Sequence, residues 1–133
     1  MLKRLTAVLI LCATQHAFAS DCPVTDFDEK YMTNVIDAVE KATSCYEAAD
    51  IAESCAMGSS MDVAITQPAI KICAADFSTE LGKNANDLNA YNKLQDRCEQ
   101  KYRNMQGTMY RSAAAFCTLD INRLYSLLYT VAE

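Results

Sequence analysis

The chain has 133 residues and carries 17 acidic against 12 basic side chains, a formal net charge of −5. An excess of negative charge disfavours binding to nucleic acid or to anionic lipid, and it favours a basic partner. The length suits one small domain preceded by a targeting segment.

Residues 1–19 have the pattern of a secretory signal peptide. Lys3 and Arg4 precede an apolar run too short to span a bilayer comfortably, and Ala17-Phe18-Ala19 supplies a small-residue cleavage signal. An uncleaved anchor and a lipoprotein signal are the alternatives. The residue before Cys12 is leucine, whereas lipoprotein processing needs a small side chain there. We therefore expect cleavage after residue 19 and export to the periplasm or the cell exterior, with no membrane insertion afterwards.

The mature domain expected from this cleavage, residues 20–133, contains no histidine, because His16 leaves with the signal. It keeps 10 basic and 17 acidic side chains, a net charge of −7. Catalysis by Ser-His-Asp or Cys-His is excluded, and no glycine motif for nucleotide binding is present. The carboxylates lie at ordinary solvent-face spacings, which disfavours a glycosidase pair. We expect no enzymatic activity, no cofactor and no bound metal.

The first predicted helix begins near Thr25, a candidate N-cap, and its apolar stripe starts at Phe27 with steps of three and four. Ser44 and Glu47 fit a capping box that would restart a helix within this pattern. The connection Gly58-Ser59-Ser60 ends it.

A second helical segment runs over residues 61–81 and contains Pro68. Proline in a helix interior costs about 3 kcal/mol. We therefore expect a break or kink at Pro68, with Thr66 capping a cleaner helix that starts there. Gly82 is expected to end this helix.

The third predicted helix ends at Gly107, because glycine adopts positive φ at little cost. Thr108 is expected to cap the fourth. The inward stripe of that last helix is expected to comprise Met109, Ala113, Cys117, Ile121, Leu124, Leu128 and Val131. No segment alternates with a period of two, so the prediction is an all-α fold. It has about four helices in antiparallel hairpins, cross-linked by disulfides.

Six cysteines remain in residues 20–133 and predict three disulfides. Cys98 and Cys117 lie nine and ten residues from Gly107. Antiparallel helices joined there place the two at the same height, about 14–15 Å from the turn, so we expect a Cys98–Cys117 bridge. No Cys-x-x-Cys pair supports a zinc site, and no cysteine shows the signals of a reactive thiol.

The other four cysteines allow three pairings. Their distance from the turn and an internal repeat favour different ones. Cys45 and Cys73 each lie 14 residues from a turn near Ser59, which favours Cys45–Cys73 together with Cys22–Cys55. Cys55 and Cys73 are spaced much like Cys98 and Cys117, and a weak internal repeat would make the two pairs equivalent. It favours Cys55–Cys73 together with Cys22–Cys45, and we prefer this second pairing by a small margin.

The chain has seven tyrosines and no tryptophan. Tyr102, Tyr110, Tyr125 and Tyr129 fall on the last two helices. At helical spacing such residues lie more often at the edge of a core than in an interface. Tyr110 and Tyr129 lie off the main stripe, so they are the pair we expect to be exposed and available to a partner.

The stretch DRCEQKYRNMQGTMYRSAAAFCTLDINRL, residues 96–124, carries a further pattern. The residues that form this pattern are, in sequence order, Cys98, Gly107, Thr108, Cys117, Thr118, Arg123 and Leu124. In order and approximate spacing they resemble the conserved end of the LprI-type lysozyme-inhibitor family of exported bacterial proteins. The chain departs from that family in the order of Asp96 and Arg97, in a single glycine before Thr108 and in lacking an upstream tryptophan. The resemblance implies a helical, disulfide-linked, periplasmic or secreted protein that binds and inhibits lysozyme, and it identifies no inhibitory residues.

These features predict an exported, non-enzymatic binding protein, and the resemblance implies a basic partner such as lysozyme. Two alternatives stay open. One is a structural or envelope-stress protein without a dedicated ligand. The other is a small-ligand carrier of the helical, six-cysteine kind, although the chain lacks the closely spaced Cys-x3-Cys of such carriers.

Overall fold

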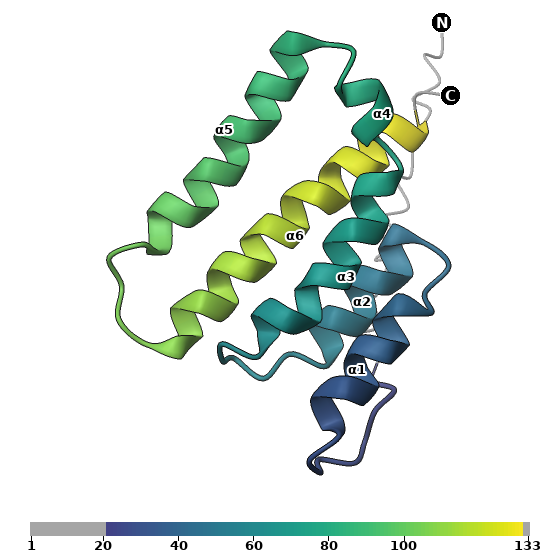
Figure 1. Ribbon diagram of the computed structural model, residues 1–133, viewed down its shortest axis with the longest axis vertical. Helices are drawn as coiled ribbons and strands as arrows, with labels where there is room; N and C mark the ends of the chain where they lie inside the picture. Colours follow the sequence, from purple (N-terminus) through teal and green to yellow (C-terminus); the bar gives the residue numbers. More distant parts are fainter. Residues whose placement is uncertain (1–20, 132–133) are drawn as a thin grey trace, which may run out of the picture.

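The computed structural model describes residues 21–131, which form helices and no strand. The helices are α1 Tyr31–Glu40, α2 Cys45–Ser54, α3 Asp62–Ala75, α4 Ser78–Leu81, α5 Ala85–Tyr102 and α6 Thr108–Val131. The hairpins α2–α3 and α5–α6 lie side by side, and α6 runs between α5 and α3 (Figure 1). The all-α prediction is confirmed. Six helices replace about four because the first two predicted segments each divide in two. The predicted signal peptide lies outside the described residues.

Side chains set the helix starts at the N-terminal end. The first helix begins at Tyr31, later than predicted, because Asp28 organises a turn before it: its Oδ1 accepts from the Lys30 N–H at 2.8 Å. Ser44 is confirmed as the N-cap of α2, because its Oγ accepts from the Glu47 N–H at 3.2 Å; the reciprocal bond of the predicted capping box goes to Thr43, the residue before the cap. Glu47 Oε2 in turn accepts from the N–H and the hydroxyl of Thr43, at 2.8 Å each.

Glu47→Gln is expected to destabilise the protein near neutral pH and to have little effect in strong acid. The two bonds from Thr43 lower the pKa of Glu47 below its ordinary value. A depressed pKa stabilises the fold above the pKa of the unfolded chain, and the contribution is lost as pH falls through the folded pKa. Urea unfolding of both proteins at neutral and acidic pH measures the difference, with Glu29→Gln as the exposed control. An equal effect of Glu47→Gln at both pH values would contradict the prediction.

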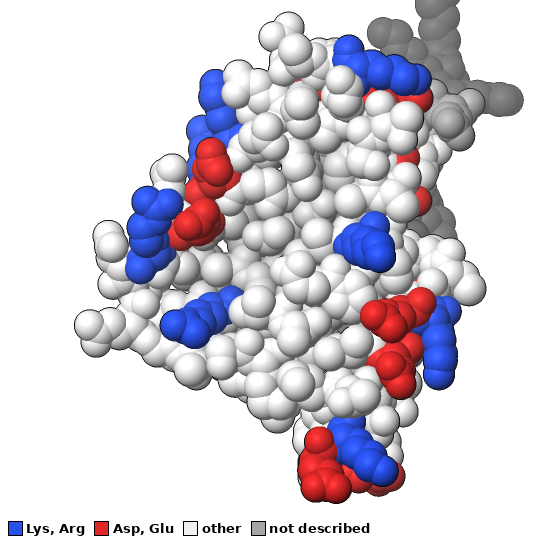
Figure 2. All heavy atoms as spheres, viewed as in Figure 1, with Lys and Arg blue, Asp and Glu red and all other residues white. Residues whose placement is uncertain are grey.

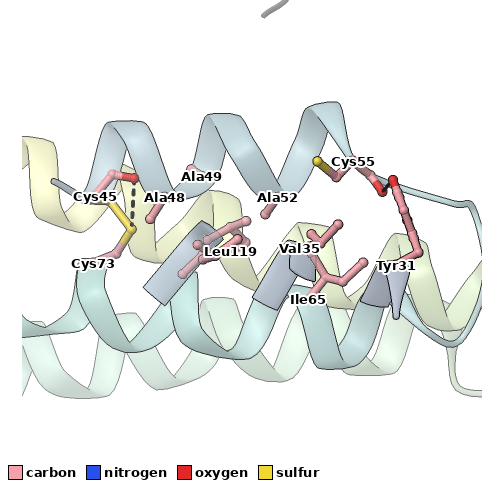
Figure 3. Packing of buried hydrophobic residues seen from close by; sticks show 12 residues of the cluster. Tyr31, Val35, Cys45, Ala48, Ala49, Ala52, Cys55, Ile65, Cys73 and Leu119 are labelled. Carbon is pink, nitrogen blue, oxygen red and sulfur yellow. Dashed lines mark hydrogen bonds between the residues drawn. A yellow bond between two sulfur atoms is a disulfide. The ribbon is translucent and has the colours of Figure 1, made fainter. Parts of the chain in front are cut away.

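The main core lies where α1, α2, α3 and α6 meet (Figure 3). Ala48, Ala49 and Ala52 of α2 are fully buried and point toward the large side chains of the neighbouring helices. Their small size allows α2 to approach those helices closely. The large partners are Val35 of α1, Ile65 of α3 and Leu119 of α6, each with no exposed surface. Larger side chains on this face of α2 would push the layers apart.

The predicted break at Pro68 is wrong, because α3 continues through the proline. Thr66 does not cap a new helix there. It is fully buried, and its hydroxyl donates to the Val63 carbonyl at 3.1 Å within the same helix. α3 packs against α1, α2 and α6, and this tertiary packing outweighs the local preference against an interior proline.

The disulfides confirm one predicted pair and correct the other two. Cys98 and Cys117 are bonded across the α5–α6 hairpin, as the spacing predicts. The preferred pairing from the repeat is wrong, since the structure joins Cys45 to Cys73 and Cys22 to Cys55. Cys45 and Cys73 lie at equal distances from the turn between α2 and α3, and their Cα atoms are 4.4 Å apart. Cys55 directly follows α2 and there meets the segment that precedes α1.

The helices α3 and α6 belong to different hairpins and run parallel to each other. Ser112 Oγ donates to Asp62 Oδ2 at 2.6 Å, and Ser126 Oγ donates to Asp76 Oδ2. The two aspartates and the two serines are each 14 residues apart, about 21 Å along a helix. These polar bonds turn one face of α6 toward α3, and α5 covers another.

The predicted inward stripe of α6 is wrong in its largest members. Met109, Leu124, Leu128 and Val131 are exposed, whereas the buried residues of α6 are Ser112, Leu119, Asn122, Tyr125 and Ser126. The polar members of that buried set have partners. Asn122 Oδ1, for example, accepts from the Tyr91 hydroxyl at 2.9 Å, and Asn122 Nδ2 donates to the Thr118 carbonyl at 2.9 Å. Paired polar groups occupy much of the inward face of α6, and large apolar side chains lie on its open face.

Candidate interaction surface

Two kinds of reactive group are absent from residues 21–131. All six cysteines of residues 21–131 are in disulfides, so this part of the chain holds no thiol nucleophile. The same residues contain no cluster of three or more histidine, cysteine or carboxylate side chains suited to a metal ion. No helix described here is long and apolar enough to cross a membrane.

Negative charge is concentrated in the first third of the described chain. Residues 21–58, which include α1 and α2, carry nine acidic and two basic side chains. Residues 59–131 carry seven acidic and eight basic side chains, and one of those acids, Asp62, is fully buried. On the face formed by α3, α5 and α6, charged side chains lie mostly at the margins around an uncharged centre (Figure 2). The layer of α1 and α2 is consequently the acidic part of the molecule.

Among the aromatic side chains of α1 and α2, Tyr46 of α2 is the most exposed, at 65 %. The guanidinium of Arg123 lies over its ring, 5.1 Å from the centroid, and donates to Glu53 Oε1 at 3.0 Å. Arg123 thus links α6 to two positions of α2 that lie on the same helix face. The ion pair is partly exposed and contributes at most about 1 kcal/mol. Its main effect is to hold Tyr46 and Glu53 in one arrangement.

A hollow of about 570 Å³ opens between α2 and α6 beside Tyr46. It is lined by Thr43, Ser44, Cys45, Tyr46, Asp76, Arg123, Ser126, Leu127 and Thr130. Its wall combines one aromatic ring, hydroxyl groups, the apolar side chain of Leu127, the guanidinium of Arg123 and the carboxylate of Asp76, which accepts from Ser126.

Asp120 lies on α6 three residues before Arg123, at the edge of the same surface. Neighbouring protein atoms partly desolvate its carboxylate, and this raises the pKa of Asp120 more than the positive charge of Arg123 lowers it.

The structure places the tyrosines differently from expectation. Tyr110 and Tyr129, expected to be exposed, are both half-buried. Tyr110 stacks on Tyr102 with ring centroids 6.4 Å apart, and Tyr129 stacks on Tyr125 at the same distance. Tyr102 of α5 covers Tyr110, and Tyr129 packs against the cluster around Phe77, so Tyr46 is a better candidate for contact with a partner than either.

The residues of the family pattern do not meet at one site. Gly107 has a φ of +115° in the turn before α6, and Thr108 is the first residue of that helix, where it was expected as a cap. Thr118 is half-buried and lines a groove between α3 and α5. Arg123 alone lies beside Tyr46, about 22 Å along α6 from Thr108. The pattern therefore contributes mainly to the hairpin and one residue to the candidate surface.

Comparison of the chain with protein-family models, with curated proteins and with solved structures finds no match.

Proposed function

We propose that this protein is exported and binds a basic cell-wall hydrolase such as lysozyme, inhibiting it without itself being an enzyme. The observation that carries the proposal is the one-sided charge of residues 21–58, nine acids against two bases, around the exposed ring of Tyr46. A concentrated negative surface accelerates encounter with a basic protein and orients it. Tyrosine is enriched among the residues that contribute most to the binding energy of protein interfaces.

The disulfides support this proposal in two ways. Three disulfides in so short a chain are typical of an oxidising compartment, which agrees with the signal-like pattern of residues 1–19. They also fix α2 at both ends, because Cys45 is its first residue and Cys55 directly follows its last. A helix held at both ends loses little freedom on binding, so more of the contact energy appears as affinity.

The double variant Tyr46→Ala/Glu53→Gln is expected to lose inhibition of lysozyme about 30-fold or more, because hot-spot truncation costs about 2 kcal/mol or more. A turbidity assay with cell-wall substrate and increasing inhibitor measures this. Glu99→Gln is the matched control, since Glu99 is an exposed carboxylate that also pairs with an arginine, Arg103 at 3.4 Å. The control should inhibit like the wild type. Full lysis at large molar excess of wild type, with lysozymes of several types, would disprove the proposed function.

A further inference from the structure

The second half of α6 exposes a row of large apolar side chains that no described helix covers. The row consists of Leu124, Leu127, Leu128 and Val131, exposed by 49, 59, 54 and 75 % respectively, and is named the α6 stripe below. Steps of three and four place these residues on one helix face. Scattered apolar side chains are normal on a protein surface, but four on consecutive turns of one helix form a contiguous patch typical of binding sites.

The α6 stripe is continuous with the candidate surface around Tyr46. Leu127 lines the same hollow as Tyr46 and Arg123, at the edge toward α2. Leu128 lines a second hollow of about 410 Å³ at the opposite edge, together with Asp87 of α5. The stripe thus extends across the open face of α6 from one neighbouring helix to the other.

The charged groups around the stripe are mostly acidic. Glu53 lies at the α2 edge through its bond to Arg123, Asp120 lies one turn before Leu124, and Asp87 lies beside Leu128. Arg123 is the one basic residue of the chain between positions 117 and 131. An apolar centre inside a polar, charged rim is the usual anatomy of a protein–protein interface.

The sign of that rim discriminates between possible occupants. Helices that lie on a membrane surface flank their apolar face with lysine and arginine, which attract anionic lipid, whereas this rim would repel it. A second copy would bring the same acidic side chains against the acidic rim, a like-charge juxtaposition that costs free energy. A basic protein with exposed apolar side chains among its lysines and arginines satisfies both the stripe and the rim.

We propose that the α6 stripe is the apolar centre of the surface through which this protein binds its basic partner. Tyr46 and the carboxylates of α2 then form one side of the rim. This inference rests on the proposed function and assigns the contact to a helix face.

The experiment follows the methyl groups of leucine and valine by NMR in the purified, oxidised, ¹³C-methyl-labelled protein while unlabelled egg-white lysozyme is added. The methyls of the α6 stripe are expected to shift or broaden at the first additions. Val63 provides an internal control, because it is 38 % exposed on α3, outside the stripe. In parallel, Leu124→Ser/Leu127→Ser is expected to weaken inhibition of lysozyme at least tenfold, and Val63→Ser to leave it unchanged.

The outcomes separate this inference from the function on which it rests. Inhibition by the wild type, with shifts at Val63 and none at the stripe, would overturn the inference and leave the proposed function standing. No inhibition and no shifts would overturn both. Stripe shifts on simple concentration of the free protein would assign the stripe to a second copy. Shifts on addition of phosphatidylglycerol vesicles, with none from lysozyme, would assign it to a membrane, and either result overturns the proposal.

Discussion

Replacing Cys45 and Cys73 together by alanine is expected to lower the free energy of unfolding by about 4 kcal/mol. Their disulfide closes a loop with a sequence separation of 28, for which the chain-entropy model gives about 3.5 kcal/mol. Both cysteines are buried in the main core, so loss of their sulfur atoms adds a small packing cost. A domain of this size has a total stability of about 5–15 kcal/mol, so the variant would keep only a fraction of it.

Denaturant unfolding of the oxidised proteins measures this loss. Cys98→Ala/Cys117→Ala is the matched comparison, because that disulfide closes a shorter loop, with a sequence separation of 19. It should cost slightly less, about 3 kcal/mol. Removal of Cys45–Cys73 should also weaken inhibition of lysozyme, since α2 loses the bond that fixes its first turn. A change in unfolding free energy below about 1 kcal/mol would contradict the role given to this disulfide.

Asp62→Ala is expected to destabilise the protein by a similar amount, about 4 kcal/mol. Asp62 is fully buried and accepts three hydrogen bonds: from the Met57 N–H at 2.8 Å, the Ser59 N–H at 3.2 Å and the Ser112 hydroxyl at 2.6 Å. The Ser112 hydroxyl is a buried donor, and such a donor left without an acceptor costs about 1–3 kcal/mol; the two backbone donors are partly buried and add less each. The carboxylate also lies in the first turn of α3, where negative charge is favourable.

Asp76→Ala is the control for this prediction, because Asp76 makes the equivalent bond to α6 through Ser126 but lies exposed. Asp76 accepts one bond where Asp62 accepts three, so the loss there should be smaller, about 1 kcal/mol. Asp62→Asn keeps one oxygen acceptor and should cost less than Asp62→Ala. Urea unfolding at neutral pH compares the three variants. Equal losses for Asp62→Ala and Asp76→Ala would show that the buried network does not stabilise the fold as described.

Local patterns predict the helices well and fail where a residue depends on distant partners. The N-cap at Ser44 and the turn at Gly107 involve neighbours in the chain, and the structure confirms both positions. Asn122 is fully buried because its amide meets Tyr91, which lies 31 residues earlier. No periodicity on α6 alone contains that information. Hydrophobicity alone therefore predicts that Leu124 is buried, whereas the structure exposes it.

The cysteines show the same contrast. Equal distance from a turn predicts Cys98–Cys117 and would also predict Cys45–Cys73, since both pairs span antiparallel hairpins. The repeat predicts the wrong partner for Cys73, because similar spacing along the chain does not specify which helices are adjacent in the fold. Of the candidate surface, the acidic charge is visible in the composition. The position of Tyr46 beside Arg123 depends on how α2 meets α6, which the sequence pattern does not indicate.

The most direct measurement is a calorimetric titration of the purified, oxidised protein with egg-white lysozyme at low and at physiological salt. The proposed function predicts saturable binding whose affinity falls as salt is added, because an acidic surface meets a basic one. It also predicts that Tyr46→Ala/Glu53→Gln removes most of that binding while Glu99→Gln keeps it. Absence of binding at low salt, or equal binding by both variants, would contradict the proposed role of the α2 surface.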